Sequence, residues 1–175
     1  MSFQRLIDHL SDQQAKFTLE SHSKAFTSQE VAQRMHVHGL NMGKVVVVVC
    51  DGYLALCLLP AHFHVDCISM AEEIGVSEIR LALESEFSGH FPQCELGAIP
   101  PFSALWQMPV YMSFAFDITQ DLVFNAGNWS EVVRMPCNEY IRIEQPKIIS
   151  KGAQAPRLTP PKIARGRGRE SLLVH

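Results

Sequence analysis

Residues 44–59 read KVVVVVCDGYLALCLL, and this stretch decides the fold. Two runs rich in β-branched and apolar residues flank Asp51-Gly52, a dipeptide that tolerates positive φ angles and suits a tight hairpin turn. The first run, Val45 to Val49, is apolar at every position, which is typical of a strand covered on both faces. The stretch therefore predicts an antiparallel hairpin near the centre of a sheet, with helices packed on it.

Shorter patterns on both sides of the hairpin predict further helices and strands. Thr27-Ser28-Gln29-Glu30 has the form of a capping box, and Asp66 can cap a helix that ends at Gly75. The pattern favours an α/β fold with a mixed, mostly antiparallel sheet packed with helices. Helices or helical turns are expected at residues 3–14, 27–39, 66–75 and 85–93, and strands at residues 16–20, 78–83, 110–116, 122–124 and 132–135.

Length and charge indicate one domain with a basic extension. The chain has 175 residues and is 47% hydrophobic, enough for one good core. Residues 1–146 hold 8 Lys and Arg against 17 Asp and Glu, whereas residues 147–175 hold 7 against 1 and are rich in Gly and Pro. We expect a domain over residues 1–146 and a flexible basic tail over residues 147–175. No apolar run is long enough to span a bilayer and no secretory signal is evident, which predicts a cytoplasmic protein.

The cysteines do not suggest thiol chemistry. They are odd in number, widely spread and never arranged as CxxC, as expected for free thiols in a reducing compartment. A structural role is favoured over a nucleophilic one, because two of them lie inside apolar runs where cysteine behaves as a small hydrophobe. The five are Cys50, Cys57, Cys67, Cys94 and Cys137.

Lys44 and the loop Gly97-Ala98-Ile99-Pro100-Pro101 are the main candidates for chemistry. A lone cation that opens a buried strand suits a polyanionic ligand, although lysine at such a position is often simply solvated. Glycine and two prolines leave nearby N–H groups without strand partners, so the loop can bind a carbonyl or an oxyanion. Such loops are also common turns, and the two features gain weight only if they converge in space.

Three other groups of residues carry alternatives. His22 lies in a loop and is either a surface group or a functional one. Asn125-Ala126-Gly127-Asn128 is either a turn or a backbone wall for a small ligand. His62, His64 and Asp66 have a spacing that could serve zinc in a metallohydrolase, but Asp66 is better explained as a helix cap. The signatures of serine hydrolases and nucleotide-binding loops are absent from the sequence.

Together these features resemble the YbaK and prolyl-tRNA-synthetase-associated editing domain family of aminoacyl-tRNA deacylases. The resemblance covers roughly residues 21–143 and rests on several motifs in the same order. They are His22 with Phe26-Thr27 and Glu30-Val31-Ala32, Lys44 before the apolar strand, Leu58-Leu59-Pro60 and Val65-Asp66, the GxxxP loop from Gly97 to Pro101, Pro109-Val110, and Asn125-Ala126-Gly127 before Val132-Val133-Arg134.

The resemblance implies a compact α/β domain that hydrolyses the ester between a wrong amino acid and the 3′ end of tRNA. It implies no metal, no cofactor and no protein nucleophile, because a water or a group of the substrate attacks the ester. Lys44 would hold the terminal adenosine and its phosphate, Gly97 would offer its N–H to the aminoacyl carbonyl, and Pro101 would shape the loop. The remaining substrate-binding positions would be His22, Thr27, Val45, Ala98, Ile99, Pro100, Asn125, Ala126 and Gly127.

We therefore expect a free-standing trans-editing hydrolase that removes a small amino acid from mischarged tRNA. Its partners would be the aminoacylated tRNA 3′ end and, where one is needed, an aminoacyl-tRNA synthetase. Arg165, Arg167 and Arg169 in the tail would contact tRNA phosphates. Departures from the family pattern at Ser23, Val45 and Asn128 leave open a non-catalytic module with the same fold that binds a tRNA end or an amino acid. A zinc hydrolase is the third alternative.

Overall fold

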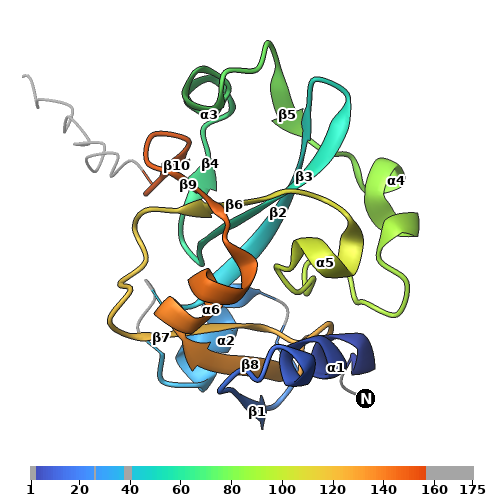
Figure 1. Cartoon of the computed structure of the whole chain (residues 1–175), viewed down its shortest axis with the longest axis vertical. Coiled ribbons are helices and arrows are strands. Elements are labelled where there is room, and N and C mark those ends of the chain that lie inside the picture. Colours follow the sequence, from blue (N-terminus) through green and yellow to red (C-terminus); the bar gives the residue numbers. More distant parts are fainter. Residues whose placement is uncertain (1–2, 26, 38–40, 157–175) are drawn as a thin grey trace, which may run out of the picture.

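The computed structural model describes residues 3–25, 27–37 and 41–156. Within them, helices and strands alternate along the chain (Figure 1). None of the described helices is long and apolar enough to cross a bilayer. The helices are α1 (Gln4–Asp12), α2 (Ser28–Arg34), α3 (Cys67–Ile74), α4 (Glu84–Phe87), the 3₁₀ turn η1 (Ser88–His90), α5 (Ser103–Trp106) and α6 (Cys137–Glu144). The strands are β1 (Thr18–Ser21), β2 (Gly43–Cys50), β3 (Tyr53–Pro60), β4 (His64–Val65), β5 (Ile79–Leu81), β6 (Val110–Ser113), β7 (Asp121–Asn125), β8 (Glu131–Pro136), β9 (Lys147–Ile149) and β10 (Ala153–Gln154).

The described strands form a five-stranded sheet and two smaller ones. The large sheet has the order β5-β2-β3-β6-β9, and the others have the orders β1-β8-β7 and β10-β4. Only β3–β6 and β6–β9 are parallel among the strand pairs of the described residues, apart from an isolated parallel bridge between Met42 and Val123. The predicted mixed, mostly antiparallel α/β fold is confirmed, although it is divided between several sheets. Figure 1 shows the large sheet above β1, β7 and β8, with α5 and α6 between them in this view.

The hairpin forms as predicted. Strands β2 and β3 pair in antiparallel register from Gly43 opposite Pro60 to Cys50 opposite Tyr53. Asp51 and Gly52 have φ angles of 43° and 91°, so both central turn residues adopt the positive φ that a two-residue type I′ turn requires. The hairpin is therefore tightly closed, and its open end carries Lys44.

Side chains of the hairpin alternate between two hydrophobic cores. Val47 and Leu58 pack into one core with residues of α1, α5, α6, β7 and β8. Val48 and Cys57 point to the opposite face and pack with Met70 of α3. Because both faces are covered, an unbroken apolar run is stable here where an exposed face would need polar residues. The sequence-based expectation of a doubly covered strand is confirmed.

Two predicted helix caps are present. Thr27 Oγ1 accepts a hydrogen bond of 3.1 Å from Glu30 N at the start of α2. Asp66 Oδ1 accepts one of 3.1 Å from Ser69 N at the start of α3, and Gly75 ends that helix with a φ of 76°. Helix α2 stops at Arg34, before the predicted limit at Gly39, which lies outside the described residues.

The prediction of a flexible tail from Lys147 onward is wrong for residues 147–154, which carry β9 and β10. Strand β9 pairs in parallel with β6 and buries Ile149, while β10 pairs with β4. The short strands escape sequence-based prediction because their partners are distant in the chain. The domain thus extends through Gln154, and the tail beyond residue 156 lies outside the described residues. Helices α5 and α6 were also not predicted; neither has a side-chain N-cap that would mark its start.

Glu73 of α3 holds the turn between β9 and β10. Its carboxylate accepts hydrogen bonds from Ser150 N and Oγ, both 2.7 Å, and from the N–H groups of Lys151 and Gly152 at 2.9 and 3.1 Å. Partial burial opposes ionisation, but these bonds outweigh it and lower the pKa of Glu73 to about 2. The ionised carboxylate therefore ties the end of the domain to α3.

We expect Glu73→Gln to make stability less dependent on pH. Because the folded pKa lies below the unfolded value, the carboxylate stabilises the protein above the unfolded pKa and loses this effect as pH falls toward 2. The loss at neutral pH should be about 1–2 kcal/mol, since solvent screens part of the interaction. Urea unfolding at several pH values measures it, with the exposed Glu72→Gln as the control. Equal pH profiles for wild type and Glu73→Gln would contradict the assignment.

Candidate active site

Lys44 and Gly97 border the same cavity. This hollow, of about 380 Å³, lies between the start of α2, the open end of the hairpin and the glycine-proline loop. Two elements that lie about fifty positions apart in the sequence therefore converge, together with the predicted Thr27 and Val45. The lining residues are Thr27, Ser28, Gln29, Lys44, Val45, Ala61, Gly97 and Trp129.

Lys44 brings an unneutralised positive charge to this cavity. It stands at the start of β2 opposite Leu59, with a partly buried side chain. Across residues 3–25, 27–37 and 41–156, no hydrogen bond or ion pair involves its ammonium group. Burial without a counterion lowers the pKa of Lys44, because water no longer solvates the ammonium fully. Such a cation is suited to bind an anionic ligand group.

Gly97 presents its backbone to the same cavity. Its φ of 81° lies in the left-handed region, which an L-residue with a side chain rarely adopts. A Cβ at this position would lie only 2.7 Å from Cζ2 of Trp129. In the described part of the chain, the Gly97 N–H has no hydrogen-bond acceptor. Position 97 therefore combines a donor without a partner with a backbone shape that favours glycine.

The two prolines of the loop lie in the core and outside the cavity lining. The carbonyl oxygen of Pro100 accepts a hydrogen bond of 2.9 Å from Trp106 Nε1, and that of Pro101 accepts one of 2.7 Å from the Tyr140 hydroxyl. These bonds anchor the proline end of the loop in the core.

The predicted wall at Asn125, Ala126 and Gly127 is likewise absent from the lining residues. All three residues are buried outside the lining. Gly127 N donates to Ala98 O at 3.0 Å, and Gly127 O accepts from Glu95 N at 2.8 Å, which joins the two loops. Ala98 and Ile99 are likewise buried and do not line the cavity.

His22 and Thr27 take different positions. Thr27 lines the cavity while it caps α2. His22 does not line it: His22 N donates to Ser130 O at 2.9 Å, and Nδ1 lies 2.8 Å from Ser23 O. Its Nε2 is buried with no hydrogen-bond partner in the described chain. The histidine loop is thus held against the segment that precedes β8.

Trp129 is the principal lining residue that the sequence reasoning missed. Its indole Nε1 donates to Leu96 O at 3.0 Å, and its ring covers Gly97. A large aromatic residue directly after Asn125-Ala126-Gly127-Asn128 is the signal that could have revealed it, because turns usually carry small or polar residues. Ser28, Gln29 and Ala61 also line the cavity and were not predicted.

The zinc-like spacing of His62, His64 and Asp66 does not assemble a site in the described residues. Asp66 instead caps α3 and accepts a hydrogen bond of 2.7 Å from Gln154 Nε2. His62 packs edge-on against Phe63. No group of three potential metal ligands converges within residues 3–25, 27–37 and 41–156.

The cysteines have structural surroundings. All five are free, and Cys50, Cys57 and Cys137 are buried. Burial raises the pKa of the thiol in each case, to about 11 for Cys94 and Cys137. A thiol with a raised pKa stays protonated and is a poor nucleophile at neutral pH. The predicted structural role is in keeping with these environments.

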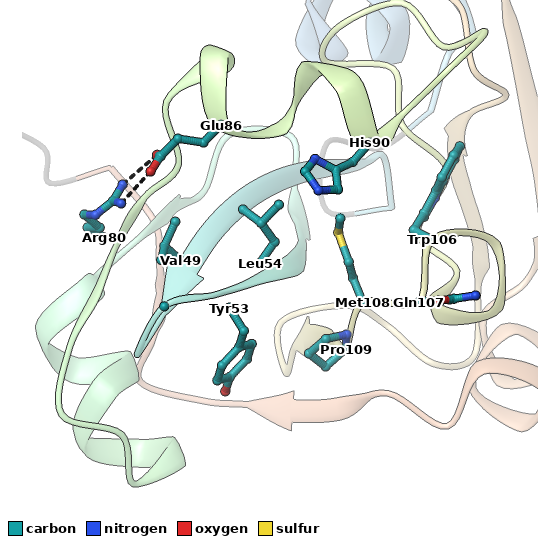
Figure 2. Close-up of a pocket in the computed structure, with 11 residues that line it drawn as sticks. Val49, Tyr53, Leu54, Arg80, Glu86, His90, Trp106, Gln107, Met108 and Pro109 are labelled. Atoms are coloured by element: carbon teal, nitrogen blue, oxygen red, sulfur yellow. Dashed lines mark hydrogen bonds and ion pairs between the residues drawn. The ribbon is translucent and has the colours of Figure 1, made fainter.

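A larger cavity, of about 660 Å³, lies at the other end of the hairpin (Figure 2). Its arginine is already neutralised, because Arg80 forms a two-point ion pair with Glu86 at 2.6 and 2.7 Å. Figure 2 shows the Arg80 and Glu86 side chains facing one another on the left of the view, with His90 and Met108 to the right. Because its described lining holds no cation free of an ion pair, this cavity is less suited to an anionic ester than the one at Lys44. Arg165, Arg167 and Arg169, predicted to bind tRNA, lie outside the described residues.

Known proteins resemble this chain in sequence and in fold. The sequence model of the aminoacyl-tRNA editing domain family matches residues 22–143, well over half of the chain. The chain is 27% identical over 158 residues to the multifunctional Ser/Thr-tRNA deacylase ProXp-y of Escherichia coli K12, covering 86% of this chain and 92% of that protein.

Solved structures share the fold at low sequence identity. The hypothetical protein APE2540 superposes with a TM-score of 0.74 at 14% identity, covering 86% of this chain and 99% of the other. A candidate trans-editing enzyme for prolyl tRNA synthetase superposes with a TM-score of 0.71 at 17% identity, covering 84% and 94%. With its mixed α/β architecture and the match over residues 22–143, the chain belongs to the aminoacyl-tRNA editing domain family.

Proposed function

We propose that this chain acts in trans to hydrolyse the ester of mischarged aminoacyl-tRNAs that carry a small amino acid. One observation carries the proposal: a cation and a backbone N–H, neither of which has a partner within the part of the chain that the structure describes, border one small cavity. The ester at the tRNA 3′ end has a phosphate and a carbonyl close to one another, so it offers a partner to each. The activity in the name of the E. coli relative supports the same reaction class.

In the proposed reaction, groups in the cavity bind and stabilise the substrate, and no side chain acts as a nucleophile. Lys44 would bind the phosphate of the terminal nucleotide, and the Gly97 N–H would donate to the aminoacyl carbonyl oxygen. A water attacks the carbonyl carbon, the oxyanion that forms is stabilised by that donor, and the intermediate then expels the ribose oxygen, which takes up a proton. Among the described residues, the lining contains no carboxylate, imidazole or thiol, so we assign the acceleration to positioning and electrostatic stabilisation.

The size of the cavity supports small acyl groups. A volume of about 380 Å³ must hold part of the terminal adenosine as well as the amino acid. Val45, Ala61 and Trp129 form apolar parts of its wall, which leaves little space for a long side chain. We therefore propose alanine, serine, threonine, cysteine and proline as the candidate amino acids.

A panel of charged tRNAs tests the proposed function. The full chain is incubated with alanyl-, seryl-, threonyl-, cysteinyl- and prolyl-tRNA, each on matched and mismatched tRNAs, and with leucyl- and phenylalanyl-tRNA as large controls. Loss of the ester is followed against the rate in buffer. Faster loss for at least one small amino acid, and none for the large ones, is expected. Binding without ester loss for every tRNA would overturn the enzyme assignment and favour a non-catalytic module.

The basic tail is proposed to raise tRNA affinity. The body of the domain carries net negative charge, so the three arginines at positions 165, 167 and 169 would offset its repulsion of the tRNA backbone. Changing all three to glutamine should reduce the slope of log K against log salt by about 2–3, since each phosphate contact contributes about 0.7–0.9. Changing all three to lysine keeps the charge and serves as the control. Filter-binding measurements with equal slopes for all three proteins would contradict the proposal.

A further inference from the structure

Trp129 is bonded to the same peptide unit that carries the free donor. The peptide between Leu96 and Gly97 contains the Leu96 carbonyl and the Gly97 N–H, which point in opposite directions in a trans unit. The indole N–H of Trp129 donates to Leu96 O at 3.0 Å. Fixing this carbonyl also fixes the direction of the N–H, and the N–H has no acceptor of its own among the described residues.

We infer that Trp129 is a positioning residue that orients the Gly97 N–H toward the substrate carbonyl. This inference rests on the proposed function and adds to it a residue that acts through the loop. Glycine permits a wide range of backbone angles, so the peptide before Gly97 needs an external restraint to keep one orientation. The hydrogen bond to Leu96 O supplies that restraint and also polarises the peptide, which strengthens its N–H as a donor.

The backbone of Trp129 is also held in place by hydrogen bonds. Trp129 N donates to Glu95 Oε2 at 2.7 Å, and Glu95 Oε1 pairs with Lys24 Nζ at 2.9 Å. The hydrogen bond from Lys24, followed by that from Trp129 N, lowers the pKa of Glu95, which keeps the carboxylate ionised at neutral pH. Ala25 N donates to Trp129 O at 3.0 Å. The donor is therefore oriented before the substrate arrives, as electrostatic catalysis requires.

A second restraint comes from the ring surface. A Cβ at Gly97 would lie 2.7 and 3.4 Å from ring atoms of Trp129, so the ring closely covers this residue. The ring could also act by limiting the volume of the cavity. The two roles differ in the part of the side chain that matters: orientation depends on the indole N–H, whereas volume depends on the ring.

Trp129→Phe and an isosteric replacement separate these roles. Phenylalanine keeps an aromatic ring without the N–H, and β-benzothienylalanine at position 129 keeps the bicyclic shape while sulfur replaces the N–H. For the amino acid that the wild type removes fastest, both variants should lower kcat about 10- to 100-fold, with KM changed less than about twofold. In NMR spectra of the free protein, the Gly97 amide proton should move upfield in both variants. Tyr53→Phe, which removes an aromatic donor from the far end of the hairpin, should match the wild type.

The outcomes distinguish this inference from the function on which it rests. A wild type that leaves every ester intact overturns the proposed function, and this role with it. An active wild type with unchanged kcat in the benzothienylalanine variant overturns the role of the indole N–H alone. An unshifted Gly97 amide signal in that variant, which retains the ring packing, would contradict the inference without any assay of activity.

Discussion

Replacing Lys44 by methionine is expected to reduce kcat/KM for deacylation by about 10²–10³-fold without unfolding the protein. The change removes a charge that would bind the terminal phosphate, and a lost charge-assisted contact with that anion costs several kcal/mol when it is shielded from water. Methionine keeps the apolar length of the side chain. Initial rates of ester loss with the preferred aminoacyl-tRNA measure the effect.

The same substitution should leave the stability of the fold unchanged or increase it. Because burial lowers the pKa of Lys44, the folded state disfavours the ammonium, and the charged group costs stability at pH values below its folded pKa. The melting temperature of Lys44→Met at pH 7 should therefore equal or exceed that of the wild type. Lys16→Met, at an exposed lysine outside the cavity, is the control for both measurements. Wild-type turnover in Lys44→Met would contradict the role of this residue.

Gly97→Ala is the second change with a large expected effect. A methyl group would meet Cζ2 of Trp129 at 2.7 Å, and the φ of 81° is unfavourable for alanine. The loop must shift, which displaces the Gly97 N–H from the position of the developing oxyanion. We expect a loss of about 10²–10³-fold in kcat, comparable with removal of one oxyanion donor, and about 1–2 kcal/mol of stability.

Gly75→Ala separates backbone strain from damage to the site. Gly75 has a similar φ of 76°, but a Cβ there would meet no atom within 4 Å. This variant should lose a similar amount of stability from strain alone and keep full activity. Chemical unfolding and single-turnover deacylation of both variants provide the comparison. If Gly97→Ala folds and turns over at the wild-type rate, the proposed role of the loop is wrong.

Local patterns were sufficient to predict the elements that frame the cavity. The apolar run before Asp51-Gly52 specified the hairpin, since an unbroken strand of this type must be covered on both faces. The caps at Thr27 and Asp66 could be predicted because each accepts a hydrogen bond from the residue three positions later in the sequence. Lys44 is also recognisable from local sequence, because it is a single charged residue at the edge of an apolar strand.

Long-range contacts account for what the sequence did not reveal. Trp129 packs over Gly97 although the two residues lie about thirty positions apart in the sequence. No periodic pattern in the sequence predicts this contact. Asn125 is a predicted pocket residue, but it is buried outside the cavity lining. Gly127, two residues later, donates a hydrogen bond to Ala98 of the glycine loop. Strand β9 depends on β6 and on Glu73, so its composition alone resembled a linker.

Lys44 and Gly97 should bind one ligand together, and an NMR titration with a stable substrate analogue can detect this. The ligand would be 3′-serylamino-3′-deoxyadenosine 5′-phosphate, in which an amide replaces the ester and resists hydrolysis. We expect the Gly97 amide and the Lys44 side-chain signals to shift with the same apparent Kd, and we expect Lys44→Met to weaken the binding that the Gly97 amide reports. Shifts confined to the larger cavity around His90 and Trp106, or a response of only one of the two groups, would contradict it.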